Sequence, residues 1–159
     1  MIIGSISENK NLEKRIAVTP DIVKKYISLG FEVLLIENYG SHLGINDAHY
    51  QKMGVKILKD EMEILNSSDI IVQLGMLPED KSSIIKENKT LIGVLNPYDN
   101  KEKLENLAKK KINLFSLELL PRITRAQSMD ILSSQANLAG YKAVIESCLL
   151  YTSDAADDQ

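Results

Sequence analysis

The chain has 159 residues, of which 44% are hydrophobic and 26% are charged, and its net charge is −3 at pH 7. This length and composition are typical of a soluble globular protein with one ordinary domain. The weak negative net charge offers no basic field that would attract nucleic acid. No apolar run reaches the roughly 20 residues of a membrane-spanning helix. A single cysteine excludes an internal disulfide. We therefore expect an intracellular protein without nucleic-acid binding or direct membrane insertion.

Apolar runs suited to buried strands alternate along the chain with segments that carry helix signals. Strands are expected at residues 1–6, 31–37, 55–58, 69–75, 90–96 and 112–120, and helices at 19–30, 47–54, 59–68, 79–88 and 101–111. In the first helix, Thr19 is expected as N-cap, Pro20 at the first helical position and Gly30 as the stop. Alternation of nearly continuous apolar strands with helices predicts an α/β fold, a doubly wound parallel sheet of the flavodoxin-like or Rossmann-like kind.

A long helix is expected from about Ala126, with small and apolar residues at 3, 4, 3, 4 spacing. We therefore divide the chain into an α/β subdomain at 1–125, a connecting helix at 126–147 and a tail at 148–159. The tail, which ends "LLYTSDAADDQ", resembles a peptide translated from sequencing-adapter DNA. We expect it to be non-native and the chain to be a truncated fragment; an acidic disordered terminus is the alternative.

The predicted start of this helix is unusually polar. The polar residues at helical spacing are Gln127, Asp130, Ser134 and Asn137, with Arg122 and Arg125 just upstream. Ligands of open α/β sheets bind outside the carboxyl ends of the strands, and the last predicted strand leads to Arg122. Elsewhere no glycine-rich phosphate loop follows a predicted strand, and His42 and His49 lack ligand-spaced partners, so no metal site is expected.

Three stretches of the sequence carry a family resemblance. "PRITRAQSMDILSSQANLAGYKAVIE", "KRIAVTPDIVKKYISLGFEV" and "GVLNPYDN" resemble the NAD-binding (alpha) subunit of proton-translocating NAD(P) transhydrogenase, over about residues 1–147. The resemblance implies two α/β subdomains flanking a cleft, of which this chain contains the first and lacks the Rossmann domain with the NAD loop. The fragment alone is then expected to be inactive.

The resemblance also implies an activity and its partners. These are hydride transfer between NAD(H), bound by this subunit, and NADP(H), bound by a partner subunit, coupled to proton translocation by membrane subunits. A homodimer is implied, with a cytoplasmic location peripheral to the inner membrane.

Carried over residue by residue, the family's contacts to the nicotinamide end of NAD(H) fall on Arg122, Gln127, Asp130 and Ser133. Gln and Ser suit a carboxamide, which both donates and accepts hydrogen bonds, and Arg can neutralise a phosphate or orient the Asp. Because hydride passes directly between the cofactors, no catalytic acid or base is expected. Helix capping by a polar first turn is the alternative role for these residues.

Two other classes of protein remain as alternatives. Alanine dehydrogenase shares the implied architecture, and Arg15 falls where that enzyme uses an Arg for the substrate carboxylate. Its Lys and His fall on Gly75 and Asn96, so this chain would lack the groups that polarise a carbonyl and move a proton. Arg15 is then expected to be structural or to contact a subunit. The third class is a non-enzymatic flavodoxin-like binding module. A receiver-type module needs clustered acidic residues at the ends of its strands, whereas Asp69 lies at the start of a predicted strand.

Overall fold

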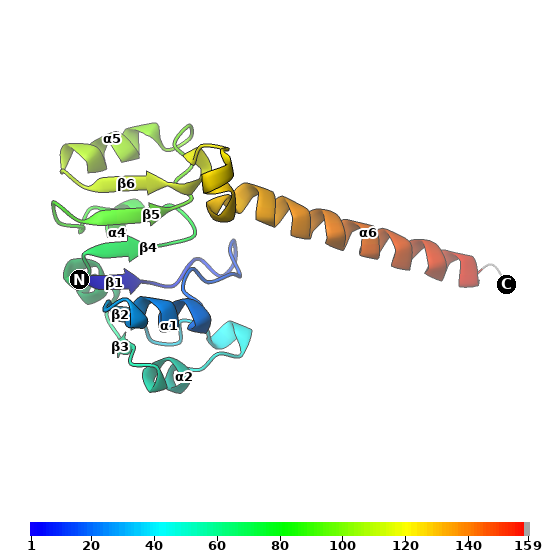
Figure 1. Ribbon diagram of the computed structural model, residues 1–159, viewed down its shortest axis with the longest axis horizontal. Coiled ribbons are helices and arrows are strands. Elements are labelled where there is room, and N and C mark those ends of the chain that lie inside the picture. The colour runs from blue at the N-terminus through cyan, green and yellow to red at the C-terminus, as the bar shows by residue number, and fades with distance from the viewer. Residues whose placement is uncertain (158–159) are drawn as a thin grey trace. The chain divides into compact units, whose positions relative to one another are not determined.

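The computed structural model describes residues 1–157, and side chains through residue 151 (Figure 1). The chain divides into two units, Met1–Ser116 and Leu117–Gln159. Among the described residues, no helix is both long enough and apolar enough to cross a membrane.

The first unit is built on a six-stranded sheet in which every pairing is parallel (Figure 1). Its strands are β1 (Ile2–Ser5), β2 (Glu32–Ile36), β3 (Lys56–Leu58), β4 (Ile70–Val72), β5 (Thr90–Gly93) and β6 (Asn113–Ser116). The spatial order is β3-β2-β1-β4-β5-β6, so the direction of winding reverses between β1 and β4. The predicted doubly wound parallel sheet is confirmed, and the reversal marks the switch point where such folds bind ligands.

Helices flank this sheet and begin within two residues of their predicted starts, whereas the helix predicted at 79–88 already ends at Ser82. They are α1 (Pro20–Ser28), the 3-10 helix η1 (Ser41–Leu43), α2 (Asp47–Lys52), α3 (Glu61–Ser67), α4 (Glu79–Ser82) and α5 (Lys101–Lys109). Thr19 occupies the N-cap of α1 and Pro20 its first position, and the chain leaves the helix through Gly30, whose φ is +84°. The Thr19 side chain makes no capping hydrogen bond, whereas Asn46 and Asp60 cap α2 and α3 through their side chains.

The core lies between the sheet and its helices. Strand residues Val33, Leu35, Ile71 and Leu91 and helix residues Val23, Ile64 and Leu65 are all fully buried. This follows from the continuous apolar strands, because a parallel sheet covered on both faces has no polar side.

A buried tyrosine ties the loop after β1 to the sheet. The Tyr39 hydroxyl accepts hydrogen bonds from the N–H groups of Ala17 and Val18, both at 3.1 Å, and lies 2.8 Å from Ser5 Oγ. The two N–H groups use its lone pairs, so its own hydrogen is donated to Ser5. Tyr50 adds a donated bond to the Val18 carbonyl at 3.0 Å. The loop that lines the switch point is therefore held by hydrogen bonds as well as by packing.

The second unit contains two 3-10 helices, η2 (Leu117–Leu119) and η3 (Thr124–Met129), followed by α6 (Ile131–Asp157). The long helix was predicted from about Ala126 but begins at Ile131. Residues 124–129 wind more tightly, and Asp130 leaves the helical region with ψ of 94° and caps α6 with its side chain. The last predicted strand also ends earlier, at Ser116.

Helix α6 covers most of the segment predicted to be a non-native tail, 148–159. Residues 158 and 159 lie outside the described residues. A helical conformation does not report on the origin of the sequence, and the non-native origin of the tail stays a prediction, as do the predicted subdomain boundaries.

Candidate functional site

The four residues predicted to contact a cofactor line one hollow in the second unit. The hollow has a volume of about 340 Å³ and is lined by Pro121, Arg122, Ile123, Thr124, Ala126, Gln127, Asp130 and Ser133. The structure therefore brings together Arg122, Gln127, Asp130 and Ser133. Thr124 and Ile123 were not singled out from the sequence. Their only signal there was their place between Arg122 and Gln127.

Asp130 is the most constrained of these residues. Its Oδ1 accepts hydrogen bonds from the N–H groups of Leu132 and Ser133, both at 3.0 Å, and its Oδ2 accepts one from Ser133 Oγ at 2.6 Å. The Ser133 hydroxyl, followed by the Ser133 N–H, holds the pKa of Asp130 below its usual value, with a smaller effect from the charge of Arg122. Asp130 is thus an ionised N-cap at the positive end of α6.

The capping arrangement decides what Ser133 can offer a ligand. Its hydroxyl hydrogen is directed to Asp130, so the oxygen has only lone pairs left and can act toward the hollow as an acceptor. Arg122 can only donate, and the Gln127 amide can both donate and accept. Helix capping, the alternative role, is observed for Asp130. It does not explain why Arg122 and Gln127 line the same hollow.

A second crevice lies at the switch point of the first unit. It has a volume of about 600 Å³, and its lining includes residues 6–9 after β1, residues 75–78 after β4, and Glu13, Glu61 and Lys81. Glu8 Oε1 accepts a hydrogen bond from the Leu74 N–H at 2.5 Å. Burial raises the pKa of Glu8, opposed by the N–H groups of Leu74 and Gly75.

Gln73, at the end of β4, is only 2% exposed and belongs to the same network. Its amide is best oriented with nitrogen toward Glu8 Oε1, at 2.9 Å, and the Ile6 carbonyl, at 3.1 Å. Glu8 and Gln73 thus join the ends of β1 and β4 by hydrogen bonds.

The positions expected to match the substrate-binding residues of alanine dehydrogenase are Arg15, Gly75 and Asn96, and their side chains and contacts do not suit that role here. Arg15 donates to Glu13 through two nitrogens, at 2.8 and 2.6 Å, and this pairing lowers the pKa of Glu13 to about 2. Gly75 lines the crevice without a side chain, and Asn96 adopts a left-handed backbone, with φ of 47°, and donates to Asp99.

The cation in the lining of the crevice, Lys81, is paired with Glu61 at 2.5 Å. With three glutamates and one lysine in its lining, the crevice disfavours a carboxylate substrate.

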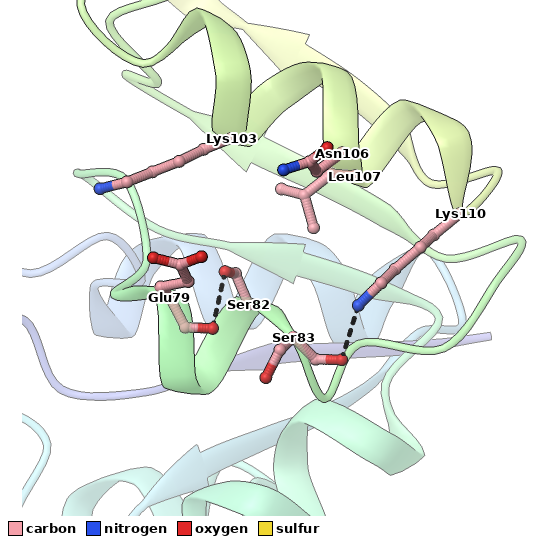
Figure 2. Close-up of a pocket in the computed structure, with 7 residues that line it drawn as sticks. All are labelled: Glu79, Ser82, Ser83, Lys103, Asn106, Leu107 and Lys110. Atoms are coloured by element: carbon pink, nitrogen blue, oxygen red, sulfur yellow. Dashed lines mark hydrogen bonds between the residues drawn. The ribbon is translucent and has the colours of Figure 1, made fainter.

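A third groove, of about 310 Å³, runs between α4 and α5 (Figure 2). Ser82 Oγ donates to the Glu79 carbonyl at 3.2 Å, and Lys110 Nζ donates to the Ser83 carbonyl at 3.0 Å. The first of these bonds lies within α4 and the second joins the end of α5 to the chain just after α4, so both are explained by local structure and packing, and neither indicates a function for this groove. Among the residues that the structure describes, no three His, Cys, Asp or Glu side chains are grouped so that they could hold a metal ion.

The first unit is a doubly wound parallel α/β domain, and the second unit carries a polar hollow at the start of a long helix. The chain belongs to the family described as alanine dehydrogenase/PNT, N-terminal domain, which matches residues 4–139. The predicted family is confirmed.

Two relatives are named as the first portion of the alpha subunit of NAD(P) transhydrogenase. The protein from Rhodospirillum rubrum is 41% identical over 151 residues, covering 92% of this chain and 39% of the relative. The protein from Rickettsia prowazekii is 38% identical over 156 residues, covering 96% of this chain and 41% of the relative. Alanine dehydrogenase 1 from Staphylococcus aureus is more distant, at 26% identity over 91% of this chain and 38% of its own length. The chain therefore spans about two fifths of the length of these relatives.

Solved structures agree with this order of similarity. The crystal structure of transhydrogenase from Sinorhizobium meliloti matches with a TM-score of 0.84 and 37% identity, over 92% of this chain and 43% of that chain. A structure of L-alanine dehydrogenase matches with a TM-score of 0.69 and 21% identity, over 74% of this chain and 32% of that one, which shows a shared fold.

Proposed function

We propose that this chain is the first α/β domain of the NAD(H)-binding subunit of an NAD(P) transhydrogenase, and that its hollow holds the nicotinamide end of NAD(H). The observation that carries the proposal is the gathering of Arg122, Gln127, Asp130 and Ser133 around one hollow. The relatives named as transhydrogenase subunits, at 41% and 38% identity, support it.

The chemistry of the lining fits a primary carboxamide. Such a group has N–H donors and a carbonyl acceptor, so it needs a protein acceptor and a protein donor side by side. Ser133 provides the acceptor, because Asp130 holds its hydrogen. Gln127 and Arg122 provide donors from the same lining.

In this proposal the residues of the hollow orient and do not exchange protons. When bound, the nicotinamide ring supplies or receives the hydride. Asp130 fixes the Ser133 hydroxyl and the start of α6, so two elements of the site are rigid before any ligand arrives. When two bound reactants must meet, holding them in the right orientation supplies a large share of the rate enhancement.

The other components of the activity lie beyond this chain's own residues. The chain contains no G-x-G-x-x-G loop, so we propose that the pyrophosphate and adenosine, and with them most of the affinity, are held by the additional length found in the relatives. NADP(H) binding, proton translocation, membrane partners, a homodimer and a location at the cytoplasmic side of the inner membrane belong to the same proposal.

An alanine dehydrogenase-like activity is supported less well. The pairing of Arg15 with Glu13 and the lack of a cation at Gly75 leave the switch-point crevice without a site for a 2-oxo acid. A non-enzymatic flavodoxin-like module is also disfavoured, because the relatives are named as a transhydrogenase subunit and an alanine dehydrogenase.

Nuclear magnetic resonance titration of the isotope-labelled chain tests the proposal directly. Nicotinamide mononucleotide should shift backbone signals of residues 121–133 with an affinity on the order of millimolar, since only one end of the cofactor is recognised. ADP-ribose, which lacks the nicotinamide ring, is the matched control and should leave these signals in place. Equal shifts with both ligands, or none with either, would contradict the assignment.

A further inference from the structure

The hollow of the second unit contains one polar side chain for which the proposed function gives no role. Thr124 lines this hollow together with Arg122, Gln127, Asp130 and Ser133. Within the part of the chain that the structure describes, the Thr124 hydroxyl makes no hydrogen bond. The hydroxyl is therefore free to bind a ligand as donor and as acceptor.

The position of Thr124 in its helix explains why the hydroxyl is free. Other helical hydroxyls of this chain donate to a carbonyl one turn earlier, as Ser28 does at 2.8 Å and Ser134 at 3.1 Å. Thr124 is the first residue of η3, so the carbonyl three residues back belongs to Pro121, outside the helix. That carbonyl already accepts the Ile123 N–H at 2.9 Å. The rotamers of a β-branched side chain are restricted, so ordering this hydroxyl against a ligand costs little entropy.

The tight winding of η3 sets Thr124 in line with the other polar residues of the hollow. In a 3-10 helix, residues three apart lie one above the other, about 6 Å apart along the axis. Thr124 and Gln127 are three apart within η3, and both line the hollow. Ser133 follows two intervals of three later, on the other side of Gln127 along the chain. The hollow therefore has hydroxyls at both ends and an amide between them.

We propose that Thr124 binds a hydroxyl of the ribose that is attached to the nicotinamide ring. This assignment rests on the proposed function, in which Gln127 and Ser133 hold the carboxamide. In a nicotinamide nucleoside the ribose is joined to the ring nitrogen, so it lies across the ring from the carboxamide. One 3-10 turn of about 6 Å from Gln127 to Thr124 matches this separation. A ribose hydroxyl both donates and accepts, as the threonine hydroxyl does.

Two small ligands that differ only in the ribose test this assignment on the full chain. 1-Methylnicotinamide and nicotinamide riboside share the charged ring and the carboxamide, and neither contains phosphate. In NMR titrations up to about 100 mM, the unmodified chain should bind the riboside about three- to tenfold more tightly, the effect of one hydrogen bond. Thr124→Val keeps the shape of the side chain and should abolish this preference. Thr124→Ser keeps the hydroxyl and should retain it.

Two control variants separate the ribose contact from the rest of the hollow. Gln127→Ala should weaken both ligands alike, because both carry the carboxamide. Ser128→Ala removes a neighbouring hydroxyl that does not line the hollow and should retain the preference for the riboside. Unchanged amide signals outside residues 121–133 show that each variant is folded.

The outcomes distinguish this inference from the proposed function on which it rests. The assignment of Thr124 is overturned if Thr124→Val still prefers the riboside, if Thr124→Ser loses the preference, or if the unmodified chain has none. The proposed function stands in each of these cases when Gln127→Ala weakens both ligands. Binding of neither ligand to the unmodified chain would contradict the proposed function and the assignment of Thr124 together.

Discussion

Removing one oxygen atom from the core should show how the loop after β1 is held. Tyr39→Phe keeps the ring, which is 2% exposed, and deletes the hydroxyl. Three polar groups then lose a partner: the N–H groups of Ala17 and Val18, and Ser5 Oγ. Val18 and Ser5 are fully buried, so water does not replace the lost oxygen for them.

The expected loss of stability follows from these contacts. A buried polar group left without its partner costs about 1–3 kcal/mol, and this applies in full to the Val18 N–H. The half-buried Ala17 N–H and Ser5 Oγ, which keeps a contact of 3.4 Å with Gln73, add less, so we expect a total loss of roughly 2–5 kcal/mol. This is a large share of the roughly 5–15 kcal/mol that stabilises a domain. Tyr50→Phe removes one bond, donated to the Val18 carbonyl, and should cost only about 1 kcal/mol.

Urea denaturation followed by circular dichroism measures these differences. Tyr26→Phe is the matched control, because the Tyr26 hydroxyl does not belong to this network, and it should change stability by less than about 0.5 kcal/mol. Hydrogen exchange gives a local reading, since the Ala17 and Val18 amides should exchange faster in Tyr39→Phe. A Tyr39→Phe variant as stable as the control would show that packing alone holds the loop and would refute this reasoning.

Two further predictions concern the proposed site and the loop charges. In a full-length subunit carrying this domain, Gln127→Ala and Asp130→Ala should slow single-turnover hydride transfer on the order of 100-fold while changing equilibrium NADH binding far less, because the ring contacts set alignment. Asp130→Asn keeps a capping oxygen and should be less damaging; unchanged transfer in both alanine variants would reduce Asp130 to a cap. The pair with Arg15 lowers the pKa of Glu13 from 4.5 to about 2. Its contribution to stability is therefore complete above about pH 4.5 and is lost as the pH falls toward 2. Arg15→Ala removes the guanidinium but keeps the backbone N–H that bonds Glu13, so the Glu13 pKa should rise from about 2 toward its usual value in a carboxyl-carbon NMR titration. A titration still near 2 would exclude the ion pair as the cause.

Much of the fold could be predicted because its signals are local. The strands around Val33, Ile71 and Leu91 are continuously apolar, which suits a sheet covered on both faces and little else. The start of α1 was readable from Thr19 and Pro20, since the first turn of a helix has its own preferences. The site residues Arg122, Gln127, Asp130 and Ser133 came from a family resemblance, and spacing alone indicated only a polar helix start.

Other features depended on groups far apart in the sequence. Strand order, and so the place of the switch point, follows from which strands pair, and no local pattern encodes that choice. Tyr39 reads as an ordinary aromatic residue, yet it satisfies N–H groups 21 and 22 residues away. The start of α6 was misplaced for a related reason: helical spacing continues through Gln127, whereas the Asp130 side chain competes for the N–H groups of Leu132 and Ser133 and begins the helix at Ile131. Periodicity reports which face of an element is apolar, but hydrogen-bond partners and helix ends are decided by the three-dimensional positions of donors and acceptors.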